Sequence, residues 1–274
     1  MSQYYKPDRN PNWNYGGGKF RLSRSKIALF LECPRCFYID NKLGTARPPG
    51  FPFNLNSAVD ALLKKEFDIH RANGTPHPLT TQYGVDAVPF NHANMNVWRE
   101  VFKGVETKHE KTGFVVSGAV DDIWVNPKGE LIVVDYKATS KDEKIEALDK
   151  EWQDGYKRQM EIYQWLLREN DFPVSDTGYF VYANAGRDKK AFDGTLEFDV
   201  TLIPYAGNAS WVEKALIDVK QCLESDALPS ADEACDYCKY REVVGKKLMA
   251  FMKKSSGSGS SSDGKKSGNA TLGI

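Results

Sequence analysis

The sequence has no excess charge of either sign and no long hydrophobic run. Its 37 lysine and arginine residues balance 37 aspartate and glutamate residues in a chain of 274. This balance excludes a globally basic nucleic-acid-binding protein, so any contact with phosphate must come from a local cluster of Lys and Arg. No apolar run approaches the ~20 residues that a membrane-spanning helix needs, and we expect no membrane association.

Cysteine and histidine are also scarce, with five and four residues. The first 20 residues contain no apolar segment of the kind that a secretory signal has, so we expect a cytoplasmic protein. Five cysteines in that compartment argue against a disulfide framework. They favour either metal binding or ordinary core packing.

Both ends of the chain are polar and poor in hydrophobic residues. Residues 1–20 contain Pro, Asn and a run of three glycines, which predicts a flexible N-terminal arm. Residues 253–274 are rich in Gly, Ser and Lys and predict a disordered tail, because such a segment cannot bury apolar surface. Residues 21–252 between them predict one domain without internal repeats.

Within this domain the hydrophobic pattern alternates between helical and strand-like periods. The first expected helix begins after Ser23, which can cap it. Further helices are expected over residues 55–70, 152–169, 210–224 and 240–252, and a weaker helical pattern covers residues 94–109. The expected strands are residues 113–125, 130–136, 178–183 and 195–203. This order predicts an α/β (α+β) fold in which helices flank a mixed sheet.

The first two expected strands form a hairpin that brings acidic residues toward one another. Asp121 and Asp122 lie on its first strand, and Asp135 and Lys137 lie at the end of its second. Because Asp135 and Lys137 are two residues apart, their side chains point to the same face of the strand. Asp135 follows an apolar run, where a carboxylate is costly to bury unless it is paired or binds a metal ion.

This group has two interpretations. Asp121, Asp135 and the backbone carbonyl of Tyr136 make an oxygen-rich site that suits Mg²⁺ or Mn²⁺, which would acidify a bound water beside a phosphate. Lys137 would orient that water or stabilise the developing negative charge. The alternative is a surface hairpin with an ordinary salt bridge between its ends, and the D-x-K spacing alone favours this alternative.

Several segments together resemble the RecB-like branch of the PD-(D/E)XK nuclease superfamily. They are Gly118-Ala119-Val120-Asp121, the strand that ends in Asp135-Tyr136-Lys137, the helix segment from Gln159 to Tyr163, and the N-terminal stretch from Leu22 to Pro34. That family shows the patterns G-x-x-D, then D-Y-K after a hairpin, then Q-x-x-x-Y on a helix. The resemblance covers about residues 22–240. It implies a restriction-endonuclease-like mixed central sheet flanked by helices, and a DNA nuclease that depends on Mg²⁺ or Mn²⁺.

The resemblance also assigns roles to individual residues. It implies that Asp121, Asp135 and Lys137 carry out phosphodiester hydrolysis. It further implies that Gln159 and Tyr163 face the active site and the DNA. Residues four apart do share a helix face, as this last assignment requires.

One position departs from the family pattern. RecB-like nucleases usually carry a metal-ligand His in the helix before the hairpin, where this chain has Asp60. Aspartate serves a hard cation at least as well as imidazole does. The alternatives are that Asp60 is a solvated helix residue and that Glu66 or His70 is the ligand. The departure bears on activity more than on fold.

Four of the five cysteines form two C-x-x-C pairs, Cys33 with Cys36 and Cys235 with Cys238. Two such pairs can supply four thiolates to one metal centre. RecB-like relatives, including CRISPR-adaptation nucleases and parts of repair helicases, hold an iron–sulfur cluster with one N-terminal and three C-terminal cysteines. The two-and-two division here leaves a [4Fe–4S] cluster, Zn²⁺ and ordinary cysteines open. Cys222 is expected in the core.

Local clusters of charge and aromatic residues offer candidate DNA contacts. Arg24, Lys157 and Arg158 are expected to contact phosphates, and Trp152 and Tyr156 are among the aromatics available to stack on single-stranded DNA. The alternative is that these charges are solvated and these aromatics belong to the core. Three functions follow: an exonuclease or endonuclease in DNA repair, recombination or phage replication; a nucleic-acid-binding module without turnover; and a subunit that depends on a helicase, integrase or other recombination partner.

Overall fold

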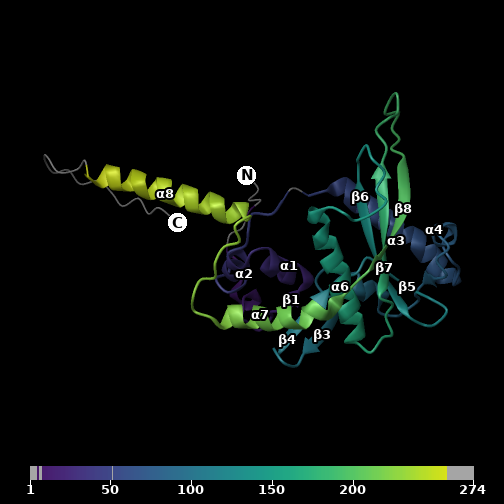
Figure 1. Ribbon diagram of the computed structural model, residues 1–274, viewed down its shortest axis with the longest axis horizontal. Coiled ribbons are helices and arrows are strands. Elements are labelled where there is room, and N and C mark those ends of the chain that lie inside the picture. Colours follow the sequence, from purple (N-terminus) through teal and green to yellow (C-terminus); the bar gives the residue numbers. More distant parts are fainter. Residues whose placement is uncertain (1–4, 6–7, 51, 258–274) are drawn as a thin grey trace. The chain divides into compact units, whose positions relative to one another are not determined.

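The chain forms two compact units, residues 1–231 and residues 232–274. The computed structural model (Figure 1) describes residues 5, 8–50 and 52–257. The remaining residues of the predicted arm and tail therefore lie outside the described residues. None of the helices in the described part is both long enough and apolar enough to cross a membrane.

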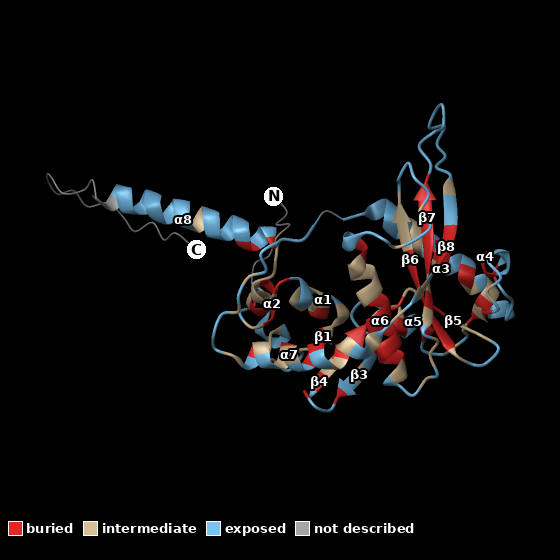
Figure 2. Ribbon diagram, in the orientation of Figure 1, coloured by how far each residue is buried: buried red, intermediate tan, exposed pale blue. Residues whose placement is uncertain are grey.

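The first unit is built around a five-stranded sheet with the strand order β2-β5-β6-β7-β8. Its strands are β2 (Val88–Pro89), β5 (Asp122–Val125), β6 (Leu131–Thr139), β7 (Thr177–Ala185) and β8 (Phe198–Ala206). β6 and β7 pair in parallel, and the other neighbours pair antiparallel. The sheet is therefore mixed, and its central strands are largely buried (Figure 2).

A second, smaller sheet has the order β1-β4-β3. Its strands are β1 (Leu22–Ser23), β3 (Val105–His109) and β4 (Phe114–Gly118). The single strand predicted over residues 113–125 is thus two strands in two sheets, β4 and β5. The chain bends between them at residues 119–121, and Asp121 lies in that bend rather than on a strand.

The helix predicted over residues 94–109 is wrong for most of its length. Only Met95–Trp98 forms a helix, α5, and the last five residues form strand β3. Burial alternates along β3, with Val105 and His109 buried and Glu106 and Lys108 exposed. That two-residue period is the strand signal that the weak helical pattern obscured.

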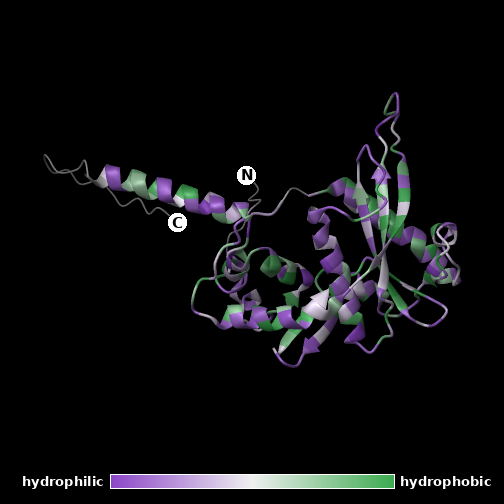
Figure 3. Cartoon of the chain, viewed as in Figure 1, coloured by the Kyte–Doolittle hydropathy of each residue, from purple (hydrophilic) through white to green (hydrophobic). Residues whose placement is uncertain are grey.

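Four other helices of the first unit lie close to where the sequence predicts them. They are α1 (Arg24–Glu32), α3 (Asn54–Asn73), α6 (Asp154–Arg168) and α7 (Val212–Glu224). The sequence patterns did not predict α2 (Pro34–Asn41), α4 (Pro78–Gln82) or the short 3₁₀ turns η1 (Pro11–Trp13), η2 (Glu151–Gln153) and η3 (Ala209–Trp211). Ser23 caps α1, since its hydroxyl accepts the backbone N–H of Lys26 at 3.4 Å. Hydrophobic and hydrophilic residues alternate in bands along the helices, as amphipathic packing requires (Figure 3).

Helices cover both faces of the five-stranded sheet. Leu131 and Val133 of β6 pack in one core with Met160 of α6, whereas Val134 packs in a second core with Phe67 of α3. Alternate residues of a strand face opposite sides, so Asp135 and Lys137 share the α6 face and Tyr136 faces α3. The mixed α/β architecture expected of a restriction-endonuclease-like fold is confirmed.

Residues 8–20 are packed against the domain and differ from the predicted flexible arm. Arg9 forms an ion pair with Asp40. The ring of Tyr15 contacts the rings of Phe20 and Phe114 edge-on, at centroid distances of 5.6 and 6.3 Å. The polar composition of this segment hid the two aromatic side chains that anchor it.

The second unit contains helix α8 (Asp236–Gly257). The helix begins four residues before the predicted start at Tyr240 and continues through Gly257. Residues 253–257, which were predicted to belong to the disordered tail, are therefore helical.

A buried ionic network joins α3 to β5 in the first unit. The Asp122 carboxylate is fully buried and pairs with Arg71 of α3 and with Arg99, whose Nη2 lies 2.9 Å from Oδ1. The hydroxyl of Tyr136 donates to its other oxygen at 2.7 Å. Arg99 also contacts both oxygens of Asp68 on α3, each at 2.9 Å. Such a network holds its elements in one arrangement because each buried charge depends on its partners.

We expect Asp122→Ala to lower the free energy of unfolding by about 3–5 kcal/mol, because Arg71 and Arg99 would lose their buried counter-ion. Urea denaturation followed by circular dichroism measures the change. Asp68→Ala is the control, since the Asp68 side chain is 44% exposed and should contribute about 1 kcal/mol or less. Equal losses in the two variants would contradict this account of the network.

Candidate active site

The acidic residues of the hairpin meet where β6 extends past the start of β5. Asp135 lies on β6 and is fully buried, and Asp121 lies in the bend just before β5. The backbone N–H of Tyr136 donates to Asp121 Oδ2 at 3.0 Å, which fixes the Asp121 carboxylate beside β6. The hairpin therefore does bring the two predicted carboxylates together.

Asp135 is surrounded by groups that hold its carboxylate in place. Gln159 of α6 donates from Nε2 to Oδ1 at 2.7 Å, and the ammonium group of Lys137 forms an ion pair with Oδ2. Burial raises the pKa of Asp135 above its usual range, Lys137 opposes this shift, and the nearby Asp121 adds to it. Lys137 also lies over the ring of Tyr156, 4.5 Å from its centroid.

Tyr163 completes the α6 side of the site and explains a glycine of the sequence pattern. Its hydroxyl lies 3.1 Å from Gln159 Nε2. A Cβ atom at Gly118 would lie 2.7 Å from Cε1 of Tyr163, so the ring occupies space that only glycine leaves open. Burial raises the pKa of Tyr163 to about 12, and the positive charge of Arg24 on α1 opposes that shift. Gln159, Tyr163 and Arg24 thus face the carboxylates together.

Lys64 of α3 is a site residue that the sequence reasoning missed. Its Nζ lies 2.9 Å from Asp60 Oδ2 and 3.5 Å from Asp121 Oδ1. An ammonium group therefore lies between the carboxylates of α3 and of the β5 bend. The available signal was its spacing of four residues from Asp60, which places both side chains on one helix face.

The structure distinguishes Asp60 from the two alternative ligands. Asp60 lines the same hollows as Asp121. Glu66 instead accepts a hydrogen bond from His77 Nε2 at 2.9 Å, and His70 Nδ1 lies 3.2 Å from the Thr75 hydroxyl. Of the three candidates on α3, Asp60 is the one that reaches the acidic group.

Two hollows meet at Asp60 and Asp121. One, of about 390 Å³, is also lined by Tyr136, Lys137 and Tyr156. The other, of about 300 Å³, is lined on its far side by Arg24, Gln159 and Tyr163 together with Lys64. The carboxylate group is therefore approached from two sides, one carrying Lys137 and the other carrying Arg24.

The donor set fits a hard divalent cation. Asp60, Asp121 and Asp135 offer carboxylate oxygens, and the Oδ2 oxygen of Asp135 has the Lys137 ammonium group as its partner. Pairing between β5 and β6 ends at Val134, so the carbonyl of Tyr136 lies beyond that ladder, on the edge where its N–H meets Asp121. An all-oxygen set of this kind is typical of Mg²⁺ and Mn²⁺ sites.

The buried network described above also positions this site. Arg99 donates from Nε to the backbone carbonyl of Asp121 at 3.0 Å, while its Nη2 contacts Asp122. The two neighbouring aspartates therefore face opposite ways, Asp121 toward the hollows and Asp122 into the α3 side of the sheet. Sequence reasoning missed Arg71 and Arg99, because no local pattern links them to the hairpin.

Lys157 and Arg158 line neither of the two hollows at the carboxylates. They line a different hollow of about 470 Å³ that Glu161 and Trp211 also line. Lys157 pairs with Asp154 at 3.0 Å. Of the three basic residues expected to contact DNA, Arg24 lies at the carboxylates, and the roles of the other two stay predictions.

Each C-x-x-C pair lies at the start of a helix in its own unit. Cys33 directly precedes α2, and its carbonyl accepts the N–H of Phe37 at 3.0 Å; Cys235 directly precedes α8, and its carbonyl accepts the N–H of Lys239 at 3.0 Å. The second cysteine of each pair follows within the first helical turn. A helix N-terminus stabilises a thiolate, so both pairs have the local chemistry of metal ligands. Cys222, expected in the core, is partly buried on α7, and burial raises its thiol pKa.

Comparison with known proteins identifies one family. The model of the PD-(D/E)XK nuclease superfamily matches residues 70–243, which is more than half of the chain. The matched part contains the hairpin with Asp121, Asp135 and Lys137 and the α6 residues that face it, whereas Asp60 and Lys64 precede it. No curated protein matches the chain.

We expect Lys64→Met to bind Mn²⁺ about tenfold more tightly, because a charge-assisted hydrogen bond of about 1.5–3 kcal/mol no longer competes for Asp60 and Asp121. Titration followed by the electron paramagnetic resonance signal of free Mn²⁺ measures this affinity without any substrate. Lys65→Met is the matched control, since Lys65 is the exposed neighbour on the same helix. Unchanged or weaker Mn²⁺ binding by Lys64→Met would show that Lys64 does not compete with the cation.

Proposed function

The chain belongs to the PD-(D/E)XK nuclease superfamily, and we propose that it is a RecB-like DNA nuclease that depends on Mg²⁺ or Mn²⁺. It would act as an exonuclease or endonuclease in DNA repair, recombination or phage replication. The observation that carries the proposal is the convergence of three residues of the matched segment: Asp121 and Lys137 line one hollow, and the buried Asp135 contacts Lys137 directly. Gln159 and Tyr163 face the same group from α6.

In this proposal Asp60, Asp121, Asp135 and the Tyr136 carbonyl hold the cation. A bound divalent cation would neutralise charge on the scissile phosphate and acidify a water molecule. The chain's own residues do the rest of the positioning. Gln159 fixes the orientation of Asp135 through its hydrogen bond to Oδ1.

Two basic groups would act on the DNA itself. Lys137 presents its ammonium group beside Asp135, where it can donate to the attacking water and stabilise the developing charge on the phosphate. Arg24, on the opposite side of the carboxylates, is placed to contact a neighbouring phosphate and so to fix the register of the strand. The hydroxyl of Tyr163 contacts both Arg24 and Gln159 and so links these two side chains.

A second candidate is a nucleic-acid-binding module with weak or no turnover. The specific observation in its favour is Lys64, which already satisfies Asp60 and Asp121 with an internal cation. The presence of Asp60 where related nucleases usually carry a metal-ligand His also favours weak or absent turnover. Dependence on a helicase, integrase or other recombination partner is a third expectation, which rests on the sequence resemblance alone.

We further propose that the four cysteines of the C-x-x-C pairs bind one metal centre, either a [4Fe–4S] cluster or Zn²⁺. Their four sulfur ligands suit both. The equivalent position of each pair at a helix N-terminus supports this proposal, because the first turn favours the deprotonated thiol. The proposal is independent of the catalytic assignment.

We expect Asp121→Ala and Lys137→Ala to reduce cleavage of labelled DNA in Mg²⁺ or Mn²⁺ by about a hundredfold or more. Single- and double-stranded substrates blocked at either end distinguish exonuclease from endonuclease cleavage. Lys128→Ala, in the exposed turn between β5 and β6, is the control and should cleave normally. Full cleavage by the two site variants would overturn the assignment; DNA binding without cleavage by the unaltered protein would favour the second candidate.

We expect the protein purified without air to contain iron with sulfide, or zinc. Elemental analysis measures both metals directly. Cys36→Ala and Cys238→Ala should each lose the metal, because each removes one of four ligands, while Cys222→Ala should retain it. Absence of both iron and zinc from the unaltered protein would contradict the cysteine site.

A further inference from the structure

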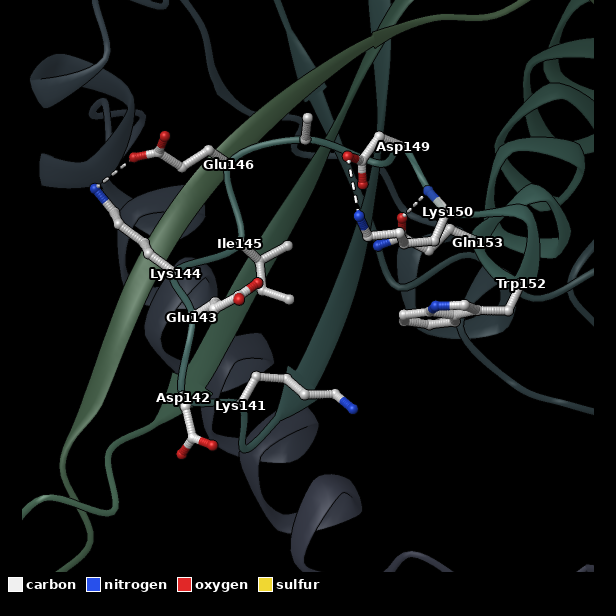
Figure 4. Close-up of a pocket in the computed structure, with 11 residues that line it drawn as sticks. Lys141, Asp142, Glu143, Lys144, Ile145, Glu146, Asp149, Lys150, Trp152 and Gln153 are labelled. Carbon is white, nitrogen blue, oxygen red and sulfur yellow. Dashed lines mark hydrogen bonds and ion pairs between the residues drawn. The ribbon is translucent and has the colours of Figure 1, made fainter.

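The segment that joins β6 to α6 itself forms a separate hollow. Its volume is about 540 Å³, and all the residues that line it fall between Lys141 and Gln153 (Figure 4). None of the carboxylates of the candidate active site lines it. The hollow contains one large aromatic side chain, Trp152, and side chains of both charges.

Trp152 is presented to solvent by an anchored turn. Its side chain is 55% exposed, although it lies on η2, whose last residue Gln153 is buried. Gln153 Oε1 accepts the backbone N–H of Lys150 at 2.9 Å, which closes this turn. The turn thus exposes the indole ring of Trp152 to solvent. An exposed tryptophan on an anchored turn favours a role in binding a ligand.

The hollow adjoins the active site through a short chain of contacts. The ring of Trp152 meets the ring of Tyr156 edge-on, with centroids 5.8 Å apart and planes at 85°. Tyr156 also contacts the ammonium group of Lys137, which lies 4.5 Å from the ring centroid. One aromatic ring therefore separates Trp152 from the proposed catalytic lysine.

Most of the charged side chains that line the hollow form ion pairs. Lys144 pairs with Glu146 and Lys150 with Asp149, both at 3.3 Å. Among the residues that line the hollow, Lys141 and Glu143 form no ion pair with any described residue, and the Lys141 side chain extends toward the side on which Trp152 lies (Figure 4).

The backbone of Lys141 is held in place from both sides. The buried side chain of Asn184 accepts its N–H at 2.8 Å and donates to its carbonyl at 3.0 Å. Because β7 fixes Asn184, the base of the Lys141 side chain is fixed relative to the sheet. The hollow thus combines the exposed ring of Trp152 with the ammonium group of Lys141, each on an anchored backbone.

We propose that this hollow is a nucleobase subsite, in which Trp152 stacks on an unpaired base of the DNA strand and Lys141 contacts the phosphate of that nucleotide. The inference rests on the proposed nuclease function and specifies its substrate as single-stranded DNA, or a duplex end whose bases have separated. Stacking on an aromatic ring contributes about 1–3 kcal/mol per base and tolerates any base. A base inside a duplex cannot reach Trp152 in this way, because both its faces are already stacked.

Fluorescence of 2-aminopurine tests the subsite without cleavage. The probe is a short single-stranded oligonucleotide that carries 2-aminopurine at each position in turn, mixed with the full chain in EDTA. We expect the unaltered protein to quench the probe at one or two neighbouring positions. Trp152→Ala should abolish that quenching and weaken binding about tenfold, whereas Trp152→Phe should restore most of the affinity.

Two further variants complete the experiment. Trp13→Ala is the matched control, since Trp13 is also an exposed tryptophan on a 3₁₀ turn and should not change binding. Lys141→Ala should lower the salt dependence of binding by about one phosphate contact. Failure of the unaltered protein to quench any position, or unchanged quenching in Trp152→Ala, overturns the subsite. The nuclease proposal is tested by a different assay, cleavage in Mg²⁺ or Mn²⁺. Absence of cleavage would overturn that proposal without changing the quenching measured in EDTA.

Discussion

The burial of Asp122 is the constraint on which the arrangement of this site depends. A fully buried carboxylate is tolerated only with partners, and here Arg71 and Arg99 supply them. Arg71 comes from α3 and Arg99 follows α5, so satisfying one charge joins helices to the edge of the central sheet. Because Arg99 also binds the carbonyl of Asp121, the same interaction that stabilises the core orients the first residue of the proposed metal site.

Strand geometry then separates structural from chemical roles. Asp122 begins β5 and pairs with Arg71 of α3, whereas Asp121 lies in the bend before the strand and faces the hollows. Along β6, the hydroxyl of Tyr136 donates a hydrogen bond to Asp122, and Asp135 and Lys137 face α6. The site is thus assembled on the rigid centre of the sheet, and Lys64 from α3 supplies a charge that balances the carboxylates when no other cation is present.

Local sequence patterns predicted the structural features that depend on residues only a few positions apart. The Ser23 cap follows from the preference for serine at a helix N-terminus. The shared faces of Asp135 with Lys137 and of Gln159 with Tyr163 follow from the strand and helix periods, although the choice of Gln159 and Tyr163 came from the family resemblance. The break between β4 and β5 and the partners of Asp122 could not be predicted in this way. Each of these depends on contacts between segments distant in sequence, and no local period records which segments meet.

The central claim is that Asp121, Asp135 and the Tyr136 carbonyl form one cation site on the edge of β6. The most direct measurement is an anomalous difference map from a crystal of the protein grown with Mn²⁺. The account predicts one peak within coordination distance of those three oxygens, with the Lys64 ammonium group turned away from Asp121. A map without a peak there, in which Lys64 still bridges Asp60 and Asp121, would contradict it.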